Sequence, residues 1–230
     1  MTMHDTVPVV FENGLGGIYS RAWEKVLPEL AKDTTTFAYN RPGYGASEAV
    51  ATPRDGEHIV EGLRSVLLSK GLEPPYVLVG HSLGGLYMQY FARRYPDEVA
   101  ALILVDSTHP NQAQGDGAIR NWPVWNRVLL WLSPRVIQNE LAGAGVTGEA
   151  TTGLPPFIGK PVILLSALHA EGEPADANEK RKDLLRLYPG AKQVWVESGH
   201  LIPREKPEVV IEAIREVLSD VRHGNAARSN

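Results

Sequence analysis

Ser82, Asp106 and His200 are residues of the types that nucleophilic catalysis requires. A serine hydroxyl is a weak nucleophile unless an imidazole takes its proton, and the imidazole needs a carboxylate that fixes its tautomer and stabilises its charged form. The chain supplies the three in the order serine, acid, histidine. They could therefore act together as nucleophile, supporting acid and base.

Ser82 is the centre of Gly80-His81-Ser82-Leu83-Gly84, where an apolar run stops and a helical pattern begins. A strand that turns into a helix within one or two residues strains the backbone at its corner, and small neighbours permit this. Such a corner holds the hydroxyl above the sheet edge and leaves the N–H of Leu83 free for an oxyanion. The pattern predicts a nucleophile elbow; a glycine-rich turn with an incidental serine is the alternative.

The elements that must position these residues are apolar strands, since each of the three follows one directly. Strands are expected at Val7–Phe11, Thr34–Tyr39, Val77–Val79, Ala101–Val105, Pro161–Ala167 and Lys192–Glu197. Helices are expected between them, at Trp23–Leu30, Glu57–Lys70, Leu86–Tyr95, after Asn178 and at Pro207–Val221. This alternation predicts an α/β fold with a mostly parallel sheet, helices on both faces and ligands at the carboxyl ends of the strands.

Residues 107–157 interrupt the alternation and predict a small helical cap within a single domain spanning residues 1–230. An amphipathic run at Val124–Leu132 and three tryptophans lie in this cap, where we expect the tryptophans to serve mainly in packing. The charge run at residues 179–183 is interpreted as a solvated helix face. Residues 223–230 are expected to form a disordered tail.

Composition excludes several classes of function. A net charge of −4, with acidic and basic residues interspersed, gives no reason to expect a nucleic acid partner or an anionic membrane patch. The absence of cysteine excludes a thiolate nucleophile and cysteine-ligated zinc, and the histidines show no metal spacing. The N-terminus lacks a signal-peptide pattern, and no apolar run approaches the roughly 18 residues of a membrane span. We expect a cytoplasmic protein without a cofactor.

Further motifs carry a resemblance to a known family. They are Gly80-His81-Ser82-Leu83-Gly84-Gly85, Arg41-Pro42-Gly43-Tyr44-Gly45-Ala46-Ser47, Arg94-Tyr95-Pro96-Asp97-Glu98-Val99, and Ser198-Gly199-His200 followed by Pro203 and Pro207. With these motifs the chain resembles an α/β-hydrolase from Val7 to about Val221. The resemblance implies a sheet of about six strands here, since the family usually has two earlier strands that Met1–Thr6 cannot supply. The strand at Thr34–Tyr39 is then an edge.

The resemblance also implies a second oxyanion donor in the glycine-rich turn after the first strand. The family usually has His-Gly at this point, whereas this chain has Asn13-Gly14. The donor carried over is the backbone N–H of Leu15.

The identity of the acid stays open between two arrangements. Most relatives carry it after the strand equivalent to Pro161–Ala167, where this chain aligns Ala170 and has Glu171 and Glu173 nearby. Asp106 instead resembles the arrangement of haloalkane dehalogenases, whose acid follows the preceding strand. We take Asp106 as the acid, with Glu171 and then Glu173 as alternatives.

These residues lead to an expected function in small-molecule chemistry. The expectation is a serine hydrolase that cleaves small to medium carboxylic esters through an acyl-enzyme intermediate. A lactonase or thioesterase would use the same triad, and a slow-turnover ligand-binding member of the fold is an alternative from another class. The sequence leaves the oligomeric state and the acyl and alcohol specificity unknown.

Overall fold

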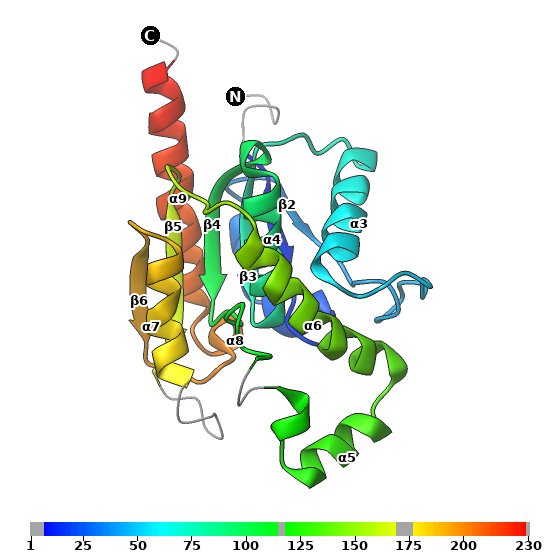
Figure 1. Cartoon of the computed structure of the whole chain (residues 1–230). Coiled ribbons are helices and arrows are strands. Elements are labelled where there is room, and N and C mark those ends of the chain that lie inside the picture. Colours follow the sequence, from blue (N-terminus) through cyan, green and yellow to red (C-terminus); the bar gives the residue numbers. More distant parts are fainter. Residues whose placement is uncertain (1–6, 115–117, 169–176, 229–230) are drawn as a thin grey trace.

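The computed structural model describes residues 7–114, 118–168 and 177–228 of the chain. Its centre is a parallel six-stranded sheet with the strand order β2-β1-β3-β4-β5-β6 (Figure 1). The strands are β1 Val9–Glu12, β2 Thr36–Ala38, β3 Tyr76–His81, β4 Val99–Val105, β5 Val162–Ala167 and β6 Lys192–Val196. The predicted fold class is confirmed, and β2 is an edge strand as expected.

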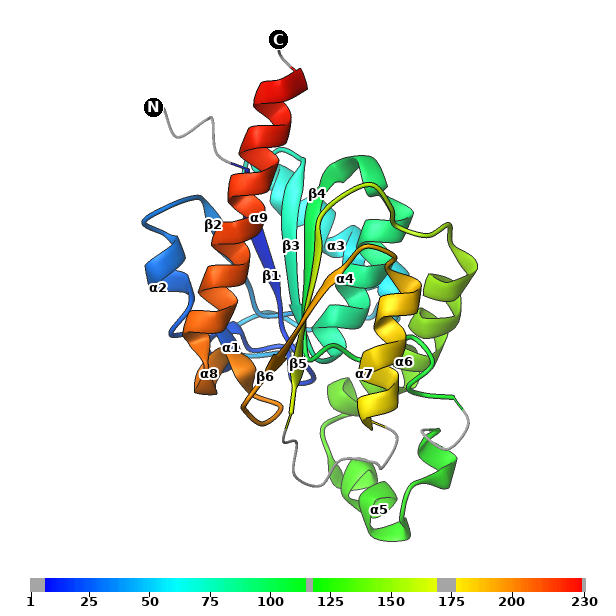
Figure 2. The same ribbon diagram turned by 90° about the vertical axis from the view of Figure 1, so that its left-hand side faces the viewer.

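Helices cover both faces of the sheet (Figure 2). One face packs against α1 Tyr19–Trp23, α2 Leu27–Leu30, α8 Ile202–Glu205 and α9 Pro207–Arg228. The other face packs against α3 Gly56–Ser69, α4 Leu83–Arg94 and α7 Ala177–Leu187. Alternate residues of each strand point to opposite faces, so Val77 and Val79 join the first core and Leu78 joins the second.

Two helices differ from expectation. The helix expected at Trp23–Leu30 is divided into α1 and α2, and Pro28 lies in the first turn of α2. A proline has no N–H and its ring clashes with the carbonyl four residues earlier, so one continuous helix is disfavoured there. Helix α9 runs to Arg228 rather than ending at Val221, so residues 223–228 of the predicted tail are helical, and residues 229–230 lie outside the described residues. No proline interrupts residues 208–228, so backbone hydrogen bonding can continue.

In the described part of residues 107–157, the region predicted to form a cap, the chain forms a 3-10 turn at Ile119–Asn121 and two helices, α5 Val124–Leu132 and α6 Arg135–Gly153. Helix α6 lies against α4 and α3. Its Gly143 and Gly148 lie close to the main chain of Arg54 and Pro110, with which a Cβ at either glycine would collide. Helix α5 lies away from the sheet (Figure 1) and buries none of its residues. Trp125 and Trp131 are 63% and 73% exposed, so the expectation that they serve in packing is wrong.

Among the described helices, none combines the length and apolar character that crossing a membrane requires.

Candidate active site

Ser82 occupies a strained corner between β3 and α4. Its backbone angles are φ 54° and ψ −126°, outside the regions that side chains with a Cβ ordinarily adopt. Its N–H donates to the carbonyl of Val105 at 3.1 Å, which ties the corner to the neighbouring strand. Gly84 allows the first turn of α4 to pass beneath β1, because a Cβ there would overlap the main chain of Glu12 and Asn13. This is the geometry of the predicted nucleophile elbow.

Asp106 and His200 meet at the same edge of the sheet. His200 Nδ1 lies 2.6 Å from Asp106 Oδ2, and the N–H of Ala167 donates to Asp106 Oδ1 at 3.1 Å. The Asp106 side chain is buried, whereas that of His200 is 42% exposed. Asp106 also has a positive φ, of 40°, and among the described non-glycine residues only Ser82 shares this. Two of the three predicted catalytic residues are therefore held in unfavourable backbone conformations.

The environment of Asp106 keeps it ionised. Burial by itself raises the pKa of Asp106, but hydrogen bonds and charge from His200 and Arg181 outweigh burial and lower the pKa well below its ordinary range. An acid that stays charged accepts the Nδ1–H of the imidazole and leaves Nε2 to act as base.

His81, the residue before Ser82, lies beneath His200. The two rings are 4.8 Å apart, and His81 Nε2 lies 2.8 Å from the carbonyl oxygen of His200. Burial, followed by the charge of His200, lowers the pKa of His81 to about 4. His81 is therefore neutral near pH 7, and its Nε2–H donates to that carbonyl. This contact places His200 next to the corner that carries Ser82.

The predicted oxyanion donors lie on two sides of Ser82. Leu83 is the first residue of α4, and a Cβ on Gly14 would lie 3.1 Å from the Ser82 Cβ, so the glycine-rich turn closely approaches the serine. Within the described residues, the N–H groups of Leu15 and Leu83 have no intramolecular acceptor. Both can therefore donate to a negatively charged oxygen beside Ser82.

Arg41 holds the glycine-rich turn from below. Its Nη1 donates to the carbonyl of Asn13 and its Nη2 to that of Gly14, each at 2.6 Å. The guanidinium is fully buried and also pairs with Glu12 at 2.6 Å and Glu140 at 2.8 Å. The carbonyls of Asn13 and Gly14 therefore point toward Arg41. The N–H of Leu15, which follows the Gly14 carbonyl in the chain, points away from Arg41. Arg41 belongs to the motif at residues 41–47, but the sequence alone does not indicate this role.

Glu140 joins this buried network from the cap helix α6. Its carboxylate accepts hydrogen bonds from Arg41, Arg54 and Tyr44 at 2.8 to 2.9 Å. Burial by itself raises the pKa of Glu140, but the two arginines lower it below its ordinary value. No pattern around Glu140 in the sequence distinguishes it from a surface glutamate. Its partners are far away in the chain, so only the folded structure reveals it.

Other candidates from the sequence have different positions. Glu171 and Glu173, the alternative acids, lie outside the described residues. His109 is buried, with Nε2 3.1 Å from Asp183 Oδ2 and Nδ1 accepting from the N–H of Asn111. His109 therefore has a structural hydrogen-bonding role. Within the described ranges, no group of three or more His, Cys, Asp or Glu side chains is arranged to hold a metal ion.

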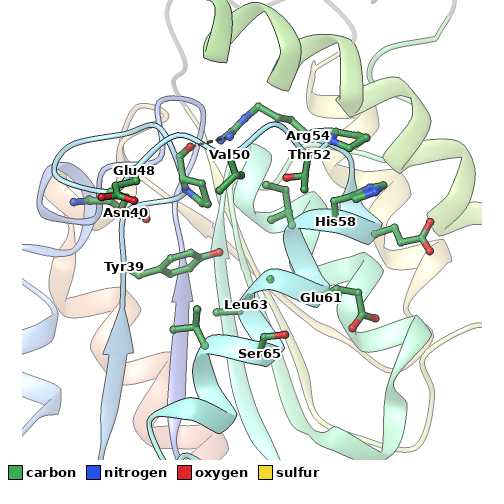
Figure 3. Close-up of a pocket in the computed structure, with 17 residues that line it drawn as sticks. Tyr39, Asn40, Glu48, Val50, Thr52, Arg54, His58, Glu61, Leu63 and Ser65 are labelled. Atoms are coloured by element: carbon green, nitrogen blue, oxygen red, sulfur yellow. Dashed lines mark hydrogen bonds between the residues drawn. The ribbon is translucent and has the colours of Figure 1, made fainter.

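The structure also contains a cavity of about 820 Å³ away from these residues. It lies between the loop that follows β2 and helix α3 (Figure 3), and its lining includes Tyr39, Val50, Arg54 and Leu63. None of the predicted catalytic residues lines it. Tyr39 and Arg54 already pair with Glu12 and Glu140, so their polar groups hold the buried network rather than an open site.

The sheet order, the elbow and the acid–histidine contact together define an α/β-hydrolase architecture. Comparison with known families agrees: the model of the alpha/beta hydrolase fold family matches residues 7–153. The chain belongs to this family, as the resemblance of its motifs indicated.

Individual relatives extend this finding. The human (Lyso)-N-acylphosphatidylethanolamine lipase is 28% identical over 225 residues, which are 90% of this chain and 65% of that protein. An uncharacterized Bacillus subtilis protein, YbdG, is 35% identical over 45% of this chain and 32% of its own length. The chain thus spans less than two thirds of these curated relatives.

Solved structures share the fold. An esterase from Thermogutta terrifontis has a TM-score of 0.69 at 24% identity, covering 94% of this chain and 90% of its own. The enol-lactonase from Burkholderia xenovorans has a TM-score of 0.67 at 17% identity, covering 95% and 94%.

Proposed function

We propose that the protein is a serine hydrolase that cleaves carboxylic esters of small to medium size. Ser82 is the nucleophile, His200 the general base and acid, and Asp106 the carboxylate that orients His200. The N–H groups of Leu15 and Leu83 hold the oxyanion. No cofactor takes part in this chemistry.

The reaction follows from these roles. His200 Nε2 takes the proton of Ser82 as the hydroxyl oxygen attacks the ester carbonyl, and the resulting oxyanion accepts hydrogen bonds from Leu15 and Leu83. The imidazolium gives this proton to the leaving alkoxide, so that an alcohol departs and an acyl group remains on Ser82. Water then attacks the acyl carbonyl with the same assistance and releases the acid.

The observation that carries the proposal is the 2.6 Å contact between Asp106 and His200 at the edge where the strained Ser82 lies. A buried carboxylate bound to the Nδ1 of a half-exposed imidazole is the arrangement that makes Nε2 a base. The unused N–H groups of Leu15 and Leu83 add the electrostatic component that acyl transfer requires. The lipase and esterase names of the relatives support the same class of reaction.

Hydrolysis of p-nitrophenyl acetate, butyrate and octanoate by the wild type and by Ser82→Ala tests the proposal. We expect Ser82→Ala to lower kcat by roughly a thousandfold or more, because nucleophile and base act as one unit. A fluorophosphonate probe should label the wild type at Ser82, as peptide mass spectrometry can show. Ser69→Ala, an exposed serine at the end of α3, is the matched control and should keep wild-type turnover.

Equal turnover in folded Ser82→Ala and wild type would refute the proposal, as would a wild type that releases no product from any of these esters. The same assay with a lactone and an acyl thioester separates the alternatives that use the same residues. Faster Ser82-dependent turnover of either would keep the mechanism and correct the substrate.

A further inference from the structure

Arg181 makes a two-point contact with the acid of the proposed triad. Its Nε donates to Asp106 Oδ1 at 2.6 Å and its Nη2 to Asp106 Oδ2 at 2.9 Å. Such paired N–H bonds match the planar guanidinium to the planar carboxylate and are stronger than single neutral hydrogen bonds. The side chains of Arg181 and Asp106 are 8% and 1% exposed, so the pair is shielded from solvent.

The position of Arg181 was not evident from the sequence. It belongs to the charge run at residues 179–183, for which the sequence predicts a solvated helix face, and this prediction is wrong for Arg181. Lys182 and Glu179 form an exposed ion pair, whereas Arg181 points inward from the same helix. Gln193 on β6 donates to the backbone carbonyl of Arg181 at 3.0 Å, which holds α7 against the sheet at this level.

The contact bears directly on the base. Asp106 Oδ2 accepts from Arg181 and lies 2.6 Å from the Nδ1 of His200, so guanidinium and imidazole share one oxygen. The charge that would stabilise a protonated His200 is therefore already offset by a permanent cation. At the same time, the two oxygens of Asp106 make four contacts with N–H donors, which together fix the carboxylate in one orientation.

We propose that Arg181 is a positioning residue of the triad, which fixes the orientation of Asp106 and offsets part of its negative charge at the oxygen that His200 contacts. This inference rests on the proposed function of the same site.

The other groups around the pair do not supply this effect. His81 at the end of β3 is neutral near pH 7 and contacts His200 through its backbone carbonyl and its ring. Glu205 on α8 accepts from the N–H of Gly199 at 2.7 Å. Among the described residues, Arg181 is the cation that pairs with Asp106. Without the charge of Arg181, the full negative charge of Asp106 favours protonated His200. As the pH is lowered, activity should therefore be lost at a higher pH than in the wild type.

The experiment compares Arg181→Met, Arg181→Lys and the control Arg186→Met, with kcat/KM for p-nitrophenyl butyrate measured between pH 5 and 9. Arg186 is on the same helix with its side chain 85% exposed. We expect Arg181→Met to move the acidic limb of the profile upward by about one pH unit. Arg181→Lys keeps the positive charge but loses the two-point contact. The acidic limb of its pH profile should therefore lie at the same pH as in the wild type, while kcat falls about tenfold. Arg186→Met should match the wild type.

A second measurement does not depend on turnover. The imidazole signals of His200, assigned by their loss in His200→Gln, can be titrated by NMR, and their midpoint should rise by the same amount in Arg181→Met. An unchanged midpoint and limb in folded Arg181→Met, with only a lower melting temperature, would overturn the inference and leave Arg181 a purely structural residue. Should Arg181→Met not fold, Arg181→Gln provides the same comparison. If wild type hydrolyses no ester while the midpoint still shifts, the proposed function fails and the charge effect stands.

Discussion

At the scale of residues, Asp106 carries the interactions on which the proposed chemistry depends. It binds His200, Arg181 and the backbone of Ala167, and its own backbone has φ 40°. An aspartate that only ended a strand would need none of these contacts. The geometry therefore favours Asp106 as the supporting acid.

Asp106→Asn tests this role directly. The amide of the variant carries no negative charge, so it accepts hydrogen bonds from Arg181 and His200 more weakly than the carboxylate does. Its NH₂ group also faces the N–H donors of these residues. His200 therefore loses the group that fixes its tautomer and orientation. We expect kcat for p-nitrophenyl butyrate to fall about a thousandfold or more. Circular dichroism and thermal melting should accompany the assay, since the loss of the Asp106 carboxylate weakens its buried contact with Arg181 and lowers stability.

Glu171→Gln is the paired measurement for the alternative acid, and we expect wild-type turnover from it. Near-normal activity in Asp106→Asn together with loss in Glu171→Gln would reverse the assignment.

At the scale of elements, α6 connects the cap to the glycine-rich turn. Glu140 on α6 pairs with Arg41, and Arg41 holds the carbonyls of Asn13 and Gly14. A change in α6 can thus reach the proposed oxyanion donor Leu15 through the buried Glu140–Arg41 ion pair and the hydrogen bonds from Arg41 to the turn.

Glu140→Gln should weaken both the fold and the turnover. The neutral amide leaves the buried guanidinium of Arg54 without its carboxylate and removes one of the two carboxylate partners of Arg41. We expect the free energy of unfolding to fall by about 3 kcal/mol, measured by urea denaturation at pH 7. We also expect a lower kcat for short esters under conditions where the variant is folded.

Glu149→Gln, an exposed position on the same helix, is the control and should change neither quantity. A stability loss in Glu140→Gln with unchanged kcat would show that the link is structural alone.

The elements themselves were largely predictable, for a physical reason. Strands buried on both faces read as short apolar runs, and each ends at a turn residue, so β1, β3, β4 and β5 are visible in the sequence. The elbow was predictable because few residue types tolerate its backbone. In contrast, the glycine-rich part of α6 has no helical signature, because its glycines serve contacts with distant main chain such as Pro110.

At the scale of the whole molecule, the features that sequence reasoning missed are the buried ion pairs. Arg41, Arg54, Glu140 and Arg181 are charged residues whose burial depends on partners that are up to 99 positions away in the chain. Charge patterns assign such residues to the surface by default. Arg41 contacts Gly14 and Arg181 contacts Asp106, so these two arginines lie next to the proposed catalytic groups. The part of the site that could not be predicted is therefore the layer of charged residues that supports it.

The strained backbone at Ser82 means that the residue expected to be best for thermal stability at this position differs from the residue that the proposed activity requires. Ser82→Gly should relieve the positive φ and raise the melting temperature by about 2–4 °C, equivalent to roughly 1 kcal/mol in a chain of this length. Ser82→Ala loses the hydroxyl but keeps the strain, so it should melt near the wild type in calorimetry. A Ser82→Gly variant that melts no higher than Ser82→Ala would contradict this. A library screened for stability alone would accordingly enrich glycine at this position and recover inactive proteins.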